Sequence, residues 1–181
     1  MNRISLATLA IALALPTALA AQTAPAATPV ATPGPAGEAL TAYNRIKPNV
    51  LKAAKKMPDA EFQFKPTPDI RTFARIVNHV TEAQFHTCTT LNGTKFDAKS
   101  VPSDTADKAT VLAGLKASFE ECDKAYGALS EANYTEVMTA GQGKRSRLGL
   151  AWGNISHDNE QYAELSTYLR LKGHVPPTAE K

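Results

Sequence analysis

The stretch NISHDNEQYAEL, residues 154–165, has no proline or glycine and predicts a helix with an uncommon polar face. Four polar residues recur at spacings of i, i+3, i+4 and i+7: His157, Glu160, Gln161 and Glu164. This spacing places their side chains on one helical face, a pattern that normally carries apolar residues. A histidine, two carboxylates and an amide on one helical face indicate a specific role for these side chains.

The whole helix is predicted from about Ser146 to Lys172 and carries two rows of residues. One row is apolar and consists of Leu148, Ala151, Trp152, Ile155, Tyr162 and Leu169. The second lies on nearly the opposite side and consists of Leu150, His157, Gln161, Glu164, Tyr168 and Leu171. A surface row would not usually begin and end with leucine, and a core row would not usually hold a histidine and a carboxylate. The second row therefore predicts the lining of an internal or semi-open polar site.

Three more segments show apolar residues at helical spacing, and they run over about residues 38–57, 68–93 and 105–129. Pro48 should kink the first, and Thr67 is the expected N-cap of the second. No run shows convincing strand alternation, and only YTEVMTA, residues 134–140, is ambiguous. Four long amphipathic helices predict an all-α four-helix bundle.

The N-terminal part predicts export. Residues 1–20, MNRISLATLAIALALPTALA, combine a basic start, a short apolar run and a small-residue cleavage site, which is typical of a signal peptide. We expect cleavage after Ala20; an uncleaved anchor is the less favoured alternative. Residues 21–37 are rich in Ala, Pro and Thr and predict a disordered linker, which leaves 38–177 as the bundle. The mature protein would be periplasmic or secreted, with no membrane span.

The charge of the chain argues against nucleic-acid binding. The formal net charge is +3, and GKRSR, residues 143–147, is the one basic block. A nucleic-acid footprint needs a basic stripe with aromatic residues on it, so a small molecule is the expected partner.

Cys88 and Cys122 bear on the direction of the helices. In antiparallel neighbours they would lie roughly 20 Å apart at 1.5 Å per residue, too far for a disulfide. In parallel helices both would lie near the same end. An exported chain allows this disulfide, and two buried free thiols are the alternative.

The second predicted helix offers partners for the polar row. His79, Glu82 and His86 recur at i, i+3 and i+7 at the margin of its apolar stripe. Imidazoles from two helices, with further donors one turn away, are how bundles build metal sites.

The chain resembles the DinB-like (DNA-damage-inducible) family of metal-dependent four-helix bundles over residues 38–177. The resemblance rests on MPDAEFQFKPTPDIRTFARIVNHV (57–80), SFEECDKAY (118–126) and HDNEQYAELSTYLRLKGHVPP (157–177). It implies an up-down-down-up bundle, in which the second and third helices run parallel. It also implies a metal site of three histidines, of which His79 and His157 match two.

The third family histidine falls on Gln161, so this chain departs from the pattern. An amide oxygen is a poorer ligand than imidazole for Zn²⁺ or Ni²⁺. A divalent metal (Zn, Ni or Mn) could still be held if another donor completes the site, and the candidates are Glu82, His86, Glu160 and Glu164. A polar but metal-free site, or polar residues that share no site, are the alternatives.

Two functions follow as expectations. Some DinB-like relatives are metal-dependent transferases that deliver a low-molecular-weight thiol, and the resemblance implies such a transferase or a metal-dependent hydrolase. The alternative is a non-catalytic periplasmic bundle that binds a small ligand or a partner. A homodimer is compatible with either function.

Overall fold

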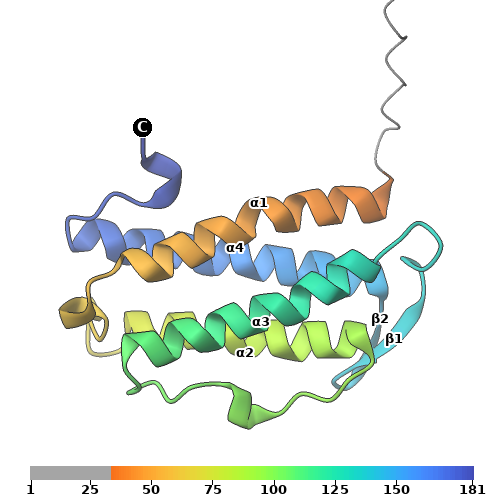
Figure 1. Cartoon of the computed structure of the whole chain (residues 1–181), viewed down its shortest axis with the longest axis horizontal. Helices are drawn as coiled ribbons and strands as arrows, with labels where there is room; N and C mark the ends of the chain where they lie inside the picture. Colours follow the sequence, from red (N-terminus) through yellow and green to blue (C-terminus); the bar gives the residue numbers. More distant parts are fainter. Residues whose placement is uncertain (1–33) are drawn as a thin grey trace, which may run out of the picture. The chain divides into compact units, whose positions relative to one another are not determined.

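The fold is a bundle of four long helices, seen in a computed structural model that describes residues 34–181. The predicted signal peptide and the first part of the predicted linker lie outside the described residues. The long helices are α1 (Pro35–Lys56), α2 (Phe73–Asn92), α3 (Lys108–Ala128) and α4 (Arg147–Leu171), shown in Figure 1.

Short elements connect the helices of the bundle. They are the 3₁₀ turns η1 (Asp59–Glu61), η2 (Ala98–Ser100) and η3 (Pro177–Ala179) and the strands β1 (Val137–Ala140) and β2 (Gly143–Ser146). The strands pair antiparallel as a hairpin, and Gly141 adopts a positive φ of 58° in its turn. Glycine allows this conformation without a steric cost. The hairpin occupies a segment that the sequence predicts to be a connection with one ambiguous strand.

Contacts at the helix ends define the topology. The guanidinium of Arg147, at the start of α4, donates to the Leu91 carbonyl near the end of α2 (2.7 Å). The Tyr168 hydroxyl, near the end of α4, donates to the Arg71 carbonyl just before α2 (2.7 Å). Helices α2 and α4 are therefore antiparallel. Figure 1 shows the long connection from α2 to α3 returning along the bundle, so that these two helices run parallel. The predicted up-down-down-up, DinB-like four-helix bundle is confirmed.

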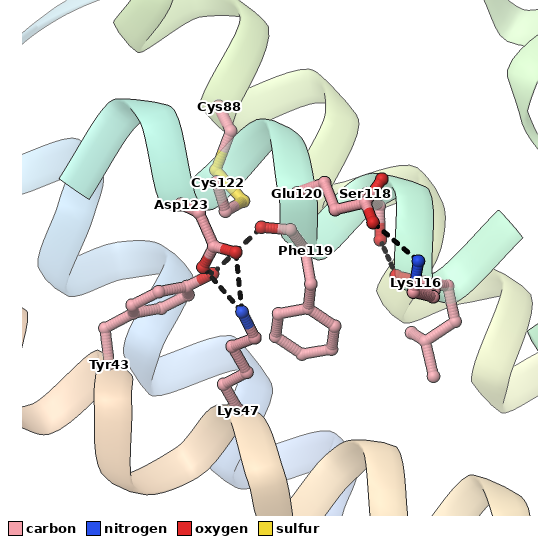
Figure 2. Close-up of polar contacts among 10 residues, drawn as sticks. Tyr43, Lys47, Cys88, Lys116, Ser118, Phe119, Glu120, Cys122 and Asp123 are labelled. Carbon is pink, nitrogen blue, oxygen red and sulfur yellow. Dashed lines mark hydrogen bonds and ion pairs between the residues drawn. A yellow bond between two sulfur atoms is a disulfide. The ribbon is translucent and has the colours of Figure 1, made fainter. Parts of the chain in front are cut away.

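Cys88 and Cys122 form a disulfide between α2 and α3, with Cα atoms 4.9 Å apart (Figure 2). Both residues are fully buried. On the same turn of α3, Asp123 accepts hydrogen bonds from Tyr43 (2.8 Å) and Lys47 (2.6 Å) of α1. One end of α3 is thus fastened to two neighbouring helices.

The apolar stripes of the sequence form the core. The stripe of α2 is buried throughout and consists of Phe73, Ile76, Val77, Val80, Gln84, Cys88 and Leu91. Tyr43 of α1 stacks on Tyr126 of α3 with ring centroids 3.9 Å apart. Trp152 departs from the prediction, because 40% of it is exposed although its row on α4 is otherwise buried or half-buried.

Helix α2 begins later than the sequence predicted. Its N-cap is Thr72, whose hydroxyl accepts the Arg75 amide (3.1 Å), and not Thr67. The first amides of α2 donate to a neighbouring segment: Phe73 to the Phe64 carbonyl (2.9 Å) and Ala74 to the Phe62 carbonyl (3.0 Å). These bonds fix residues 68–72 as a connection instead of a first helical turn.

The boundaries of the bundle also need correction. Helix α1 begins at Pro35, so residues 35–37 are helical and do not belong to the linker. The amide of Ala36 donates to Glu131 (2.9 Å), which satisfies a free N–H group of the first turn. The helix continues through Pro48. At the other end Glu180 pairs with Lys56, so the folded part extends past residue 177.

Candidate functional site

The side chains of His79 on α2 and His157 on α4 meet in the structure. Their Nε2 atoms lie 3.1 Å apart, and their rings meet edge to face at 74° with centroids 4.9 Å apart. Helices α2 and α4 run antiparallel and pack side by side. Residues 79 and 157, which are 78 positions apart in the sequence, therefore become neighbours. The two histidines expected from the family pattern therefore share one site.

The surroundings of both imidazoles favour the neutral form. Burial lowers the pKa of His79 and of His157, and the Arg71 guanidinium acts in the same direction on both. The Glu160 carboxylate opposes this effect at His157, but burial is the larger influence. A neutral ring keeps a lone pair, so one ring donates its Nε2–H to the other, or both offer Nε2 to a cation.

A cleft of about 530 Å³ opens beside the histidine pair. Its lining comes from α2, α4 and the connection before α2, and consists of Asp69, Ile70, Arg71, His79, His157, Glu160, Gln161, Glu164 and Tyr168. Gln161 is 3% exposed, and its Oε1 has no hydrogen-bond partner among the described residues. We refer to this space as the histidine cleft.

The structure separates the four alternative donors into two groups. Glu160 and Glu164 line the histidine cleft. Glu82 does not; it pairs with Arg75 (3.4 Å). His86 packs against Phe96, with tilted rings and centroids 4.0 Å apart, and lines a separate cleft of about 260 Å³ that also reaches His157. Glu82 and His86 are therefore poorly placed to complete a site between His79 and His157.

The sequence did not point to the loop residues of the cleft. The sequence predicts Asp69, Ile70 and Arg71 in the first turn of the second helix, whereas the structure places them in the connection before α2 and in the lining of the cleft. The cue was the pair of prolines at positions 66 and 68, since proline disfavours helical backbone at the residue before it. Two prolines so close together indicate an irregular connection.

Two buried polar residues of α4 were also missed. Asp158 is fully buried and Asn154 is 3% exposed. The Asn154 amide lies 3.4 Å from the Tyr126 hydroxyl and 3.5 Å from an Asp158 carboxyl oxygen. Burial raises the pKa of Asp158 well above its ordinary value. Their spacing of i, i+4, with Asn154 directly before the buried Ile155, was the available signal.

The donor set fits a weakly held divalent cation. Two imidazole nitrogens about 2.1 Å from one zinc ion at a tetrahedral angle lie roughly 3.4 Å apart, close to the separation seen here. The two Nε2 atoms face each other, and Gln161 belongs to the lining of the same cleft, so these three residues are the candidate donors. In residues 34–181 no group of three or more His, Cys, Asp or Glu could hold a metal ion. The residues fit two imidazoles plus an amide oxygen, and not three strong ligands.

The bundle agrees with comparisons to known proteins. A model of the DinB superfamily matches residues 42–165, and the chain belongs to this superfamily. A DinB-like protein from Bacillus cereus has 15% identity and a TM-score of 0.65, over 77% of this chain and 93% of that one. A DinB-like protein from Bacillus subtilis has 15% identity and a TM-score of 0.62, over 76% and 93%. These likenesses establish the fold.

A further structure with the same fold is a mycothiol-dependent maleylpyruvate isomerase. It has 15% identity and a TM-score of 0.61, over 73% of this chain and 61% of that chain. This chain therefore spans less than two thirds of that enzyme. No significant match was found among curated proteins.

Proposed function

We propose that the histidine cleft binds a divalent cation through His79, His157 and Gln161 and serves a metal-dependent transferase or hydrolase acting on a small molecule. The observation that carries this proposal is the approach of the two Nε2 atoms to 3.1 Å from separate helices. The fold shared with an isomerase named as mycothiol-dependent supports a thiol as one co-substrate. Water is the co-substrate of the hydrolase variant.

The proposal assigns a separate role to each group of residues in the cleft. His79 and His157 hold the cation, and their lowered pKa values keep them ready to bind it near neutral pH. Such a cation supplies Lewis-acid activation of a thiol or a water molecule. Glu160 and Glu164 line the same cleft and can accept the proton that a thiol or water releases. Ile70 and Tyr168 give the substrate an apolar surface.

A second candidate is a non-catalytic protein that binds a small ligand in the same cleft. The observation that favours it lies in the Nδ1 atoms of both histidines, which are buried without a hydrogen-bond partner in the described part of the chain. Histidines that bind metals almost always donate this second nitrogen to a carboxylate, a carbonyl or water. A binding protein needs no such support.

We also propose that the protein is exported and acts in the periplasm or outside the cell. The composition of residues 1–20 supports this location, as does the disulfide, because such bonds persist in oxidising compartments. No helix between residues 34 and 181 is long and apolar enough to cross a membrane.

The experiment that tests the metal proposal measures bound metal and melting temperature after dialysis against Zn²⁺, Ni²⁺ or Mn²⁺. A cation present at 100 times its dissociation constant should stabilise the protein by about 2.7 kcal/mol. The His157→Ala variant should lose both the metal and the shift. If the wild type retains no metal and its melting temperature stays constant, the metal-dependent function is wrong and the binding protein is favoured.

A further inference from the structure

A groove separate from the histidine cleft runs between α1 and α3. Its volume is about 340 Å³, and its lining consists of Lys47, Leu51, Lys55, Leu112, Lys116, Phe119, Glu120 and Asp123. None of these residues lines the histidine cleft, whose walls come from α2, α4 and the connection before α2. We refer to this second space as the α1–α3 groove. A ligand bound there would not occupy the candidate metal site.

Helices α1 and α3 run antiparallel along the groove, and this direction orders its residues. The Lys47 ammonium donates to Asp123 in the later part of α3 (2.6 Å). Lys108, at the start of α3, pairs with Asp59 just after the end of α1 (3.0 Å). Lys55 is two helical turns beyond Lys47, so it lies toward the start of α3, roughly 12 Å along α1 from Lys47.

The middle of the groove is apolar. Leu51 of α1 and Leu112 of α3 are half-buried, and Phe119 of α3 is 1% exposed. Figure 2 shows the Phe119 ring extending from α3 toward α1, and the Lys47 ammonium lies 6.0 Å from the ring centroid. An alkyl chain placed along this lining would remove the partly exposed leucine surfaces from water, which is favourable.

The lysines of the groove differ in their partners. Asp123 binds the Lys47 ammonium, and Lys116 pairs with Glu120 on its own helix (2.7 Å), as Figure 2 shows. Both carboxylates of the lining are thus engaged. Lys55 is exposed, and no carboxylate of residues 34–181 lies at ion-pair distance from it. Within the described chain, the unpaired charge of the lining is therefore positive and lies at one end of the groove.

Charge and apolar surface together define the ligand. The unpaired ammonium of Lys55 attracts an anionic group, and the apolar middle of the groove accommodates an alkyl chain that extends from it. A second copy of this chain is a poorer occupant. A symmetric dimer would place the same lysine-rimmed surface against itself, and such like-charge contacts are unfavourable.

We propose that the α1–α3 groove binds small amphiphiles with one carboxylate and a straight alkyl chain, the class of the medium-chain fatty acids. Lys55 binds the carboxylate, and Leu51, Leu112 and Phe119 contact the chain. The inference does not rest on the proposed function, because the groove and the histidine cleft share no residue.

The test is a titration of the protein with sodium octanoate at constant ionic strength, below the concentration at which octanoate forms micelles. Calorimetry measures the affinity, and NMR shifts of the Leu51 and Leu112 methyl groups locate the site. We expect saturable binding of octanoate. Octan-1-ol and n-octylammonium, which share the chain but lack the negative charge, should bind at least about tenfold more weakly, as should acetate, which lacks the chain.

Two substitutions test the two halves of the site. Lys55→Gln removes the positive charge and Leu112→Gln makes the chain-binding surface polar, so each should weaken octanoate binding at least about tenfold. Lys144→Gln, at an exposed position of the β1–β2 hairpin, is the matched control and should leave the affinity unchanged. Lys55 also lies in the last turn of α1, where a positive charge stabilises a helix. If that were its whole role, Lys55→Gln would lower the melting temperature without changing the octanoate affinity.

Several results would overturn the fatty-acid assignment. They are no binding of octanoate, equal binding of octanoate and n-octylammonium, or an unchanged octanoate affinity in Lys55→Gln. A concentration-dependent dimer with NMR shifts confined to the groove would also overturn it, because a second copy would then be the occupant. None of these results affects metal retention by His79 and His157, which is measured separately.

Discussion

The Nε2 atoms of His79 and His157 face each other at 3.1 Å across the interface of α2 and α4. Burial lowers the pKa of both rings, which favours their neutral forms, so one Nε2–H can donate to the other ring, or both Nε2 atoms can face a cation. The histidine pair is the centre of the candidate site, because both side chains line the histidine cleft. It gives the metal proposal its most specific prediction, at the position next to the pair.

Replacing Gln161 by histidine should strengthen metal binding. The side chain lies in the histidine cleft one helical turn from His157, and imidazole is a better ligand than an amide oxygen for Zn²⁺ or Ni²⁺. We expect Gln161→His to raise Zn²⁺ affinity by at least about tenfold, or about 1.4 kcal/mol. Competition with a chromophoric chelator measures the change. Gln63→His, at an exposed position, is the control and should have no effect, and equal affinities for all three proteins would contradict the geometry.

Removing the disulfide should destabilise the bundle without changing its fold. The bond joins Cys88 and Cys122 across a separation of 34 residues. Closing a loop of this length stabilises a protein by about 3–4 kcal/mol. The double variant Cys88→Ala with Cys122→Ala should lose this amount of unfolding free energy in urea titrations. A reductant should destabilise the wild type and leave the double variant unaffected; equal sensitivity of both would show that the bond contributes nothing.

Asp158 should make stability depend on pH. Its pKa is raised by burial above the value of an unfolded aspartate, about 3.9. At pH values between these two, the folded state binds one proton more than the unfolded state. Stability therefore falls as pH rises, by up to about 1.4 kcal/mol per pH unit.

The Asp158→Asn variant removes this titration. The wild type should lose stability from pH 4 to pH 7, and the variant should not. The unfolding free energy of the variant should therefore increase relative to that of the wild type over this range, as measured by urea denaturation at each pH. A difference between the two proteins that stays constant over this range would show that Asp158 is not held in its protonated form.

The start of α2 can be located by two threonine substitutions. Thr72 caps the helix through its bond to the Arg75 amide, whereas Thr67 is exposed and lies outside the helices. Thr72→Ala should cost about 1 kcal/mol of unfolding free energy, and Thr67→Ala should cost close to nothing. The reverse order would place the helix start where the sequence alone suggested.

The sequence predicted the bundle because its apolar residues recur at helical spacing over long segments. The stripe from Phe73 to Leu91 is buried throughout, and Ser146 is the N-cap of α4, at the predicted start of that helix. This periodicity is a local property of the sequence, so the class of fold could be predicted without knowing which distant residues are in contact.

The remaining parts of the site depend on contacts that no local pattern contains. Asp69 and Arg71 reach the cleft because Phe62 and Phe64 accept hydrogen bonds from the first amides of α2. Asp158 lies at a position of α4 where helical spacing predicts burial, but carboxylates are almost never fully buried unless paired, so its residue type argued against that position being in the core. In the same way, the separation of Glu82 and His86 from the histidine cleft follows from partners elsewhere, such as Arg75 for Glu82.

The most direct measurement of the central claim is an X-ray absorption spectrum of the Zn²⁺-loaded protein. The account predicts two imidazole nitrogens at about 2.0–2.1 Å, further oxygen ligands and no sulfur. The imidazole signal should decrease in the His79→Ala variant. A protein that keeps no zinc after desalting, or a spectrum without imidazole scattering, would contradict the claim that His79 and His157 hold one cation.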